Sequence, residues 1–191
     1  NNPDQLLNML IRSFAPSIYG NEMPKLACLC SLVGGVPMKQ TQDISIRENI
    51  NLLLIGDPGV SKSQLLKFIS ATSTRGIYIS GRGASGAGLT AAIMRLPGQA
   101  EFTLEPGALI LSDRGVCCID EFDKILEQDR TAIYEVLEQQ TISISKAGIN
   151  ASLNARTTVC AAANPKYSKW DPTKSLKENI DLPEALISRF D

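Results

Sequence analysis

The sequence predicts a three-layer α/β fold with a parallel sheet, and three observations carry that prediction. Short apolar segments, each long enough for one buried strand, alternate with segments of helical periodicity. A glycine-rich loop joins the first of these strands to a helix, and acidic residues directly follow a later strand. This pattern is typical of parallel strands that helices cover on both faces.

Four buried strands are predicted, and helices follow two of them. The strands are residues 50–55, 77–80, 116–119 and 157–163. A helix that begins at about Lys62 follows the first strand. A second helix, with Ile133, Val136 and Leu137 on one face, follows the third.

Two further segments break this rhythm and are interpreted as β-hairpins. In residues 141–154, apolar and polar side chains alternate along two arms, with Lys146-Ala147-Gly148 between them. Lys146 is therefore expected near the tip of this hairpin. The second hairpin is expected at residues 102–111, centred on Pro106-Gly107, after a short helix at about residues 89–95.

Composition excludes several classes of function. The 191 residues include 19 Lys and Arg against 20 Asp and Glu, a net charge of −1. Bulk positive charge therefore cannot coat nucleic acid, and any contact with a polyanion has to be local. No apolar run approaches the roughly 20 residues of a membrane helix, and the first residues lack the basic and apolar regions of a signal peptide. The sequence has no histidine, which excludes an imidazole base.

The five cysteines do not indicate a disulfide framework or a zinc site. Their number is odd, and no pair has the C-x₂-C spacing of a zinc site. Cys117, Cys118 and Cys160 lie in apolar runs, where we expect them to be buried as small hydrophobic residues. A reducing compartment is expected.

Residues 56–63, GDPGVSKS, form the motif that carries most of the chemistry. They lie between a buried strand and a helix, the context of a phosphate-binding loop, whose backbone N–H groups and helix N-terminus attract phosphate. Lys62 would reach the β- and γ-phosphates, and the Ser63 hydroxyl would coordinate Mg²⁺. Ser61 stands where the third glycine is usual, and an ordinary Gly/Pro turn is the alternative. The residues assigned to nucleotide binding here are Gly56, Asp57, Pro58, Gly59, Val60, Ser61, Lys62, Ser63 and Gln64.

The other half of the site is expected where the strand at residues 116–119 ends. Asp120 would hold Mg²⁺ through water, and Glu121 would polarise the attacking water; a solvated acidic helix start is the alternative. Asp123 could equally be a helix cap. Asn164 ends the next strand and would lie beside these residues if the strands are neighbours, to orient water or contact the γ-phosphate. It could also be a turn residue before proline.

These residues, in this order, resemble the AAA+ ATPase core of the MCM (minichromosome maintenance) replicative DNA helicases. The matching segments are residues 56–63 (GDPGVSKS), 81–91 (GRGASGAGLTA), 118–123 (CIDEFD), 146–149 (KAGI), 161–165 (AAANP) and 188–191 (SRFD). The resemblance extends from about Ser17 to the end of the chain. MCM loops carry a small residue where Ser61 lies, so that departure agrees with the family. Residues 141–149 and 182–191 look most like the seventh subunit of the eukaryotic hexamer.

The resemblance implies a fold, cofactors and roles at the matched positions. The fold is a three-layer AAA+ P-loop NTPase core with a parallel sheet and two inserted β-hairpins, and the cofactors are ATP and Mg²⁺. Lys62, Ser63, Asp120 and Glu121 keep the roles given above. Asn164 resembles the sensor residue that positions water and the γ-phosphate.

The resemblance also assigns residues outside the phosphate site. Arg189 resembles the arginine finger that reaches the nucleotide of the neighbouring subunit. Ile18, Tyr19 and Gly20 resemble the segment that lies against the adenine, where backbone groups and an aromatic edge would hold the base. Lys146 resembles the pore-hairpin lysine that touches the DNA backbone, and the second predicted hairpin would also face the pore. The alternatives are a helix-end cation for Arg189, an aromatic residue at the boundary of surface and core for Tyr19, and a solvated hairpin tip for Lys146.

The implied function is that of a nuclear, ATP-dependent DNA helicase subunit in a hexameric ring. The ring would couple hydrolysis to DNA translocation and unwinding, with other MCM subunits and DNA as partners. One lysine binds DNA weakly, but phosphate contacts add around a ring. The alternatives are a ring subunit that mainly binds ATP structurally and a protein-remodelling AAA+ ATPase. We interpret residues 1–191 as an excised core with weak hydrolysis alone, and expect an oligonucleotide-binding domain before it and a helical lid after it.

Overall fold

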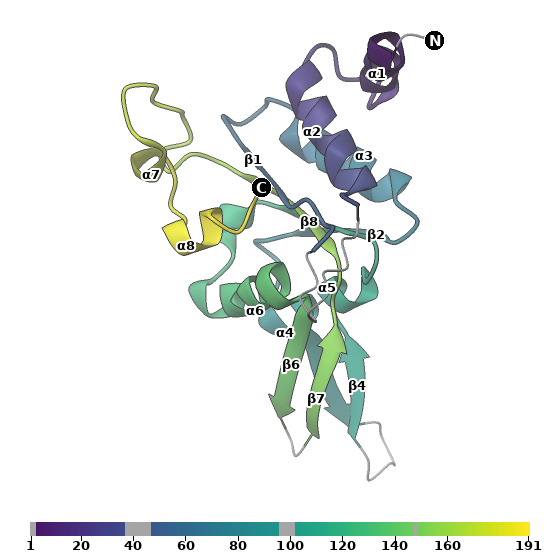
Figure 1. Cartoon of the computed structure of the whole chain (residues 1–191). Helices are drawn as coiled ribbons and strands as arrows, with labels where there is room; N and C mark the ends of the chain where they lie inside the picture. The colour runs from purple at the N-terminus through teal and green to yellow at the C-terminus, as the bar shows by residue number, and fades with distance from the viewer. Residues whose placement is uncertain (1–2, 37–46, 96–101, 147–148) are drawn as a thin grey trace, which may run out of the picture.

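The computed structural model describes residues 3–36, 47–95, 102–146 and 149–191 and has the predicted α/β fold (Figure 1). Its central sheet is parallel, with the strand order β1-β8-β5-β2. The strands are β1 (Leu52–Ile55), β8 (Thr158–Ala163), β5 (Val116–Asp120) and β2 (Gly76–Ser80). All four predicted strands are confirmed, and β8 lies directly beside β5. The polar residues that follow these two strands therefore meet at one edge of the sheet.

Helices cover both faces of the sheet and create two hydrophobic cores (Figure 1). One face carries α2 (Glu22–Val33) and α3 (Lys62–Thr72). The other carries α4 (Gly86–Leu89), α5 (Ala108–Leu111), α6 (Glu127–Gln139) and α8 (Glu184–Ile187). Alternate residues of β5 divide between the cores, with Val116 and Cys118 under α3 and with Cys117 and Ile119 on the opposite side. Three layers result, as predicted.

The three cysteines expected in the core are buried. Cys117, Cys118 and Cys160 each have an exposed fraction of 0%. Cys118 and Cys160 are direct neighbours on β5 and β8, within the core under α3. Their small side chains let the helix pack close to the sheet.

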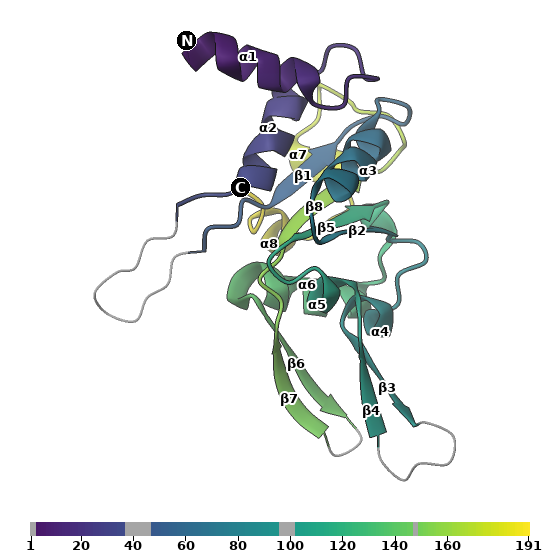
Figure 2. The ribbon, with the colours of Figure 1, turned by 90° about the vertical axis from the view of Figure 1, so that its right-hand side faces the viewer.

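Two β-hairpins extend in the same direction from the side of the sheet that carries α6 (Figure 2). One pairs β6 (Thr141–Lys146) with β7 (Ile149–Asn154), as predicted, and Lys146 lies opposite Ile149 at its end. The tip at residues 147–148 and the Lys146 side chain lie outside the described residues. The other hairpin pairs β3 (Ala91–Arg95) with β4 (Phe102–Pro106).

The short helix expected at residues 89–95 and the hairpin expected at residues 102–111 are both wrong. These residues form β3, β4 and α5 instead. Gly107 is not at a hairpin tip, because its N–H donates to the Thr90 carbonyl oxygen at 2.6 Å. A Cβ on Gly107 would lie 2.6 Å from the carbonyl oxygen of Gly88. The Pro-Gly pair therefore marks a close approach between two backbone segments rather than a chain reversal.

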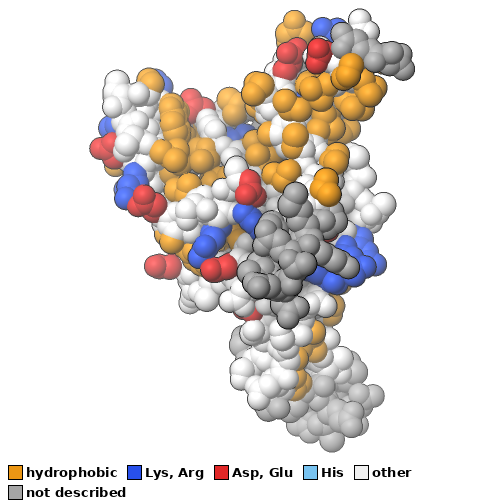
Figure 3. All heavy atoms as spheres, viewed as in Figure 1, with side chains coloured by type: hydrophobic (Ala, Val, Ile, Leu, Met, Phe, Trp, Pro, Cys, Tyr) orange, Lys and Arg blue, Asp and Glu red, His pale blue; other side chains and the backbone are white. Residues whose placement is uncertain are grey.

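The first helix, α1 (Pro3–Ser13), packs on α2 and leaves an apolar surface open. Leu6 and Met9 are 56% and 66% exposed, and apolar side chains gather at the end of the molecule where α1 and α2 lie (Figure 3). The short α7 (Leu176–Asn179) lies in the chain between β8 and α8. Within the described ranges, no helix combines the length and apolar character needed to cross a membrane.

Candidate nucleotide site

The phosphate loop joins β1 to α3 and leaves its backbone donors open. Gly59 (φ 86°) and Ser61 (φ 66°) adopt left-handed conformations, a pattern typical of loops that cup an anion. Among the described residues, none accepts a hydrogen bond from the N–H groups of residues 59–64. Open N–H groups at the start of an eleven-residue helix fit phosphate oxygens. The other loop residues assigned to the nucleotide, Pro58, Val60 and Gln64, are exposed.

Lys62 connects the phosphate loop to the end of β8. Its Nζ donates to the carbonyl oxygens of Gly56 (2.6 Å) and Asp57 (2.8 Å) and to Oδ1 of Asn164 (3.1 Å). Burial lowers the pKa of Lys62, and the charge of Asp120 opposes this shift. The structure therefore brings Lys62 and Asn164 together. The sequence predicted that Asn164 lies beside Asp120 and Glu121 if their strands are neighbours, and β8 and β5 are indeed neighbours.

Asp120, the last residue of β5, accepts a hydrogen bond from the hydroxyl group of Tyr78, whose Oη lies 2.7 Å from Oδ2. Burial raises the pKa of Asp120, but the Ser63 and Tyr78 hydroxyls, the N–H of Glu121 and the charge of Lys62 together hold the pKa below its usual value. An ionised carboxylate beside a serine hydroxyl is an oxygen ligand set that suits Mg²⁺.

Glu121 is held in a strained position directly after β5. Its backbone is left-handed (φ 49°), which costs about 1 kcal/mol for a residue with a side chain. Oε2 accepts a hydrogen bond from Ser80 Oγ at 2.9 Å and lies 3.9 Å from Nε of Arg82. A Cβ on Gly81 would lie 2.5 Å from the Glu121 carbonyl oxygen. The edge strand β2 thus holds both carboxylates, through Tyr78 and Ser80.

Asp123 does not act as a helix cap. It lies in a 3₁₀ turn, Phe122–Lys124, and its side chain is only 5% exposed. Its Oδ1 accepts the backbone N–H of Asn164 at 3.1 Å, and its Oδ2 lies 2.9 Å from Nζ of Lys124. Asp123 therefore fixes the backbone of Asn164, whose side chain faces Lys62.

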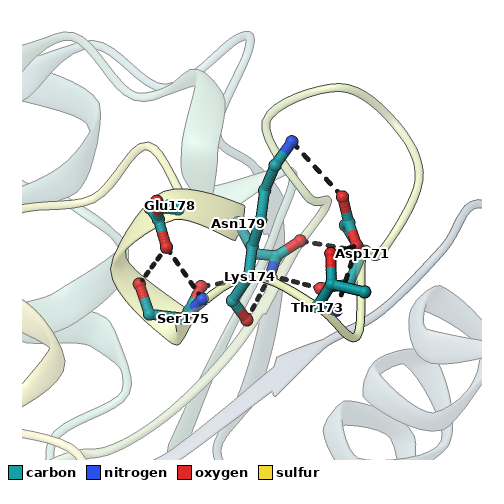
Figure 4. Close-up of polar contacts among 6 residues, drawn as sticks. All are labelled: Asp171, Thr173, Lys174, Ser175, Glu178 and Asn179. Atoms are coloured by element: carbon teal, nitrogen blue, oxygen red, sulfur yellow. Dashed lines mark hydrogen bonds and ion pairs between the residues drawn. The ribbon is translucent and has the colours of Figure 1, made fainter.

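The loop after β8 is also attached to the phosphate loop. The N–H of Trp170 donates to Asp57 Oδ1 at 2.6 Å. The buried Asn179 holds this loop together, because its side-chain amide donates to the carbonyl oxygens of Asp171 (2.9 Å) and Lys174 (3.2 Å) and accepts the N–H of Asp171 (2.8 Å) (Figure 4). The sequence motif did not predict the contact between Trp170 and Asp57, since these residues are 113 positions apart in the chain.

Three predicted positions lie apart from this network. Arg189 follows α8, and its Nη2 lies 2.9 Å from Oε2 of Glu138 on α6. Residues 18–20 connect α1 to α2 and include Tyr19, which is fully exposed. Lys146 lies at the end of β6. Within the part of the chain that is described, no hydrogen bond joins Arg189 or residues 18–20 to the phosphate loop.

A cavity of about 850 Å³ lies apart from this site. It lies at the opposite edge of the sheet, among the ends of α2 and α3 and the loops before β5 and β8. Two of its arginines already have partners. Arg156 contacts both carboxylate oxygens of Asp113 at 3.1 and 2.8 Å, and Arg47 lies 2.8 Å from Asp191.

Comparison with known families agrees with this geometry. The model of the MCM family, described as the MCM P-loop domain, matches residues 1–191. This chain belongs to the MCM P-loop domain family. The AAA+ P-loop NTPase fold expected from the resemblance is therefore confirmed, with the parallel sheet and two inserted hairpins of this MCM chain in place.

The MCM relatives include proteins named for DNA replication. The chain is 60% identical over 182 residues to DNA replication licensing factor mcm7 of Schizosaccharomyces pombe, and 58% identical over 182 residues to that of Xenopus tropicalis. Each match covers 95% of this chain. The chain is also 54% identical over 189 residues, 99% of its length, to DNA replication licensing factor MCM4 of Arabidopsis thaliana.

The chain spans about a quarter of the length of these curated MCM relatives, between 22% and 25%. The likeness to the seventh subunit, which residues 141–149 and 182–191 suggested, agrees with the first two relatives.

Proposed function

We propose that this chain is the ATPase core of a ring-forming DNA helicase subunit. The subunit couples ATP hydrolysis to movement along DNA and to strand separation during the initiation and elongation of replication. The observation that carries the proposal is the meeting of Lys62, Asn164 and Asp120 beside the open N–H groups of residues 59–64. The names of the relatives support a role in replication, and with it a nuclear location and other MCM subunits as partners.

The nucleotide and metal fit the polar groups at this edge of the sheet. The open N–H groups and Lys62 bind phosphate oxygens, and Ser63 and Asp120 hold Mg²⁺. Among the described residues, there is no cluster of three or more carboxylates or thiols that holds a metal ion by itself. Mg²⁺ would therefore share its ligands with the phosphates, as is usual for this ion, and would neutralise their developing charge.

Hydrolysis is assigned to Glu121, Asn164 and Arg189. Glu121, whose carboxylate Ser80 holds at 2.9 Å, orients and polarises the attacking water. Asn164 positions water and the γ-phosphate through its side-chain amide. The 2.9 Å contact of Arg189 with Glu138, away from the phosphate loop, supports a role at the nucleotide of the neighbouring subunit.

The two hairpins support the assignment of a DNA-binding pore. Both extend from the same side of the sheet (Figure 2), and Lys146 ends the first strand of one of them. A ring would align equivalent hairpins, so phosphate contacts add up although the net charge of the chain is −1.

The phosphate site is tested by titrating Mg·ATP calorimetrically into this chain and its variants. We expect saturable binding, which Lys62→Ala weakens by at least about 100-fold because two charge-assisted contacts are lost. Lys177→Ala is the matched control, since this exposed lysine pairs with Glu184 and, among the described residues, forms no hydrogen bond with the phosphate loop. Equal affinities for the chain and Lys62→Ala would contradict the assignment.

The DNA role is tested separately in the assembled ring. Lys146→Ala should abolish unwinding and leave basal ATP hydrolysis within about twofold. Unchanged unwinding would remove DNA as the substrate and favour a protein-remodelling ATPase.

A further inference from the structure

A buried lysine lies behind the segment assigned to the base. Lys25 on α2 is only 4% exposed. Its Nζ donates to the carbonyl oxygen of Ile18 at 2.6 Å. Within the described ranges, the ammonium group has no other hydrogen-bond acceptor and no carboxylate at ion-pair distance. Burial of a charge is costly, so a lysine with one neutral partner needs an explanation beyond packing.

The segment that Lys25 holds is short and conformationally strained. Ala15 (φ 43°), Gly20 (φ 67°) and Asn21 (φ 54°) all have left-handed backbones within seven residues. Such strain persists only where the surroundings fix the chain, and it concentrates at functional sites. The N–H of Ile18 donates to the Ala15 carbonyl oxygen at 2.9 Å, so both polar backbone groups of Ile18 have partners, one within the segment and one on α2.

The two residues after Ile18 have polar backbone groups that are available to a ligand. Among the described residues, the backbone groups of Tyr19 and Gly20 have no hydrogen-bond partner, and the Tyr19 side chain is fully exposed. These residues, with Ile18 and Lys25, line a cavity of about 440 Å³. Ile18 also shares a hydrophobic core with Leu65 of α3, the helix that starts in the phosphate loop. The segment is thus anchored to the element that carries the phosphate site.

We propose that Lys25 is a positioning residue, which holds residues 18–20 in the shape that binds the base of a nucleoside triphosphate. Among the described residues, no hydrogen bond joins Lys25 to the phosphate loop, so its contribution is to recognition of the base and not of the triphosphate. This inference rests on the proposed function, because it assigns Lys25 to the same nucleotide site.

The test compares two ligands, Mg·ATP and magnesium inorganic tripolyphosphate, which lacks the base and sugar. Each is titrated calorimetrically into the full chain, Lys25→Met and Ser31→Ala. Methionine keeps the length of the side chain but removes the buried charge and its hydrogen bond. Ser31 is the matched control, because it is also buried on α2 and also donates to a backbone carbonyl oxygen, that of Ile50 at 2.9 Å.

We expect Lys25→Met to weaken Mg·ATP by roughly tenfold and to leave tripolyphosphate within about twofold. Its melting temperature should stay close to that of the parent, because relief of the buried charge offsets the lost hydrogen bond. Ser31→Ala should leave the ratio of the two affinities unchanged.

Other outcomes separate the two proposals. If the parent chain binds ATP no better than tripolyphosphate, or binds neither, the proposed nucleotide site is wrong. If the parent prefers ATP and Lys25→Met keeps that preference, the positioning role is wrong while the site stands. A loss of both affinities together, or a variant that does not fold, would make Lys25 a structural residue and would also overturn the inference.

Discussion

The two edges of the central sheet differ in how their polar groups are satisfied. Where β1, β8 and β5 end, the N–H groups of residues 59–64 are open and Glu121 is held in a strained conformation. At the opposite edge, a cavity of about 850 Å³ is bordered by Arg156 and Arg47, which already pair with Asp113 and Asp191. Cavity volume alone would favour the second edge. Polar groups that the fold leaves available therefore identify a site better than cavity volume does.

The largest effect is expected from Glu121→Gln in the assembled ring. Because the amide cannot accept a proton from water, we expect ATP hydrolysis at the interface that contains this site to fall about 100-fold or more, with ATP binding kept within about threefold. Steady-state hydrolysis and nucleotide titration measure the two effects. Glu48→Gln, beside the cavity at the opposite edge, should change neither. An unaffected rate in Glu121→Gln would mean that the subunit binds ATP only as part of the ring structure.

A substitution at the opposite edge should affect stability and not nucleotide binding. A Cβ on Gly115 would collide with the backbone of Arg75, so Gly115→Ala should lower the free energy of unfolding by about 2 kcal/mol. Urea denaturation measures this loss, and titration of the folded protein should give the parent affinity for ATP. Gly83→Ala is the control, since the nearest atom to its Cβ is 4.0 Å away. An unchanged free energy of unfolding for Gly115→Ala would contradict this prediction, because it would show that the backbone near Arg75 can move to accept the added methyl group.

Strain in the phosphate loop predicts that a glycine at position 61 raises the free energy of unfolding, by less than Gly115→Ala lowers it. Ser61 is left-handed (φ 66°), so Ser61→Gly should raise the free energy of unfolding by about 0.5 kcal/mol, after the entropy of glycine is subtracted. Gly59→Ala should lower it by about 1 kcal/mol from backbone strain alone, because nothing lies within 4 Å of its Cβ. Denaturation of both variants checks the pair. Equal and unchanged stabilities would contradict a strained loop.

The smallest expected effect is the pH dependence of the Asp113–Arg156 pair. The hydrogen bonds from Arg156 lower the pKa of Asp113 in the folded state. Its contribution to stability is thus complete above the unfolded pKa of about 3.9 and is lost as pH falls through the folded value. Asp113→Asn should reduce the loss of stability between pH 7 and pH 3. Denaturation at both pH values measures it, and an unchanged difference would show that the pair does not contribute.

The hairpins show what the sequence could and could not predict about the fold. Residues 141–154 were predictable because alternating side chains flank a single turn signal. The other hairpin has two Pro-Gly pairs, Pro97-Gly98 between its strands and Pro106-Gly107 after them. The second pair packs against Gly88, and that contact is not visible in the local sequence.

The candidate site likewise contains residues that the sequence could predict and residues that it could not. Lys62, Asp120 and Asn164 were predictable because the residue types and their places after buried strands specify the chemistry. Tyr78 and Ser80 were not, because they act only through the position of β2 next to β5, and the order of strands in a sheet is set by tertiary packing.

β5 belongs to both hydrophobic cores and ends in the two carboxylates, and this dual membership limits how the protein can change. A larger side chain at Cys118 would push toward α3, and one at Cys117 would push toward the opposite layer, yet each is within four residues of Glu121. Because β5 packs against both cores, a substitution in one core also shifts the strand relative to the other. A change of side-chain volume in one core therefore has to be balanced in the other if Asp120 and Glu121 are to keep their positions beside the phosphate loop.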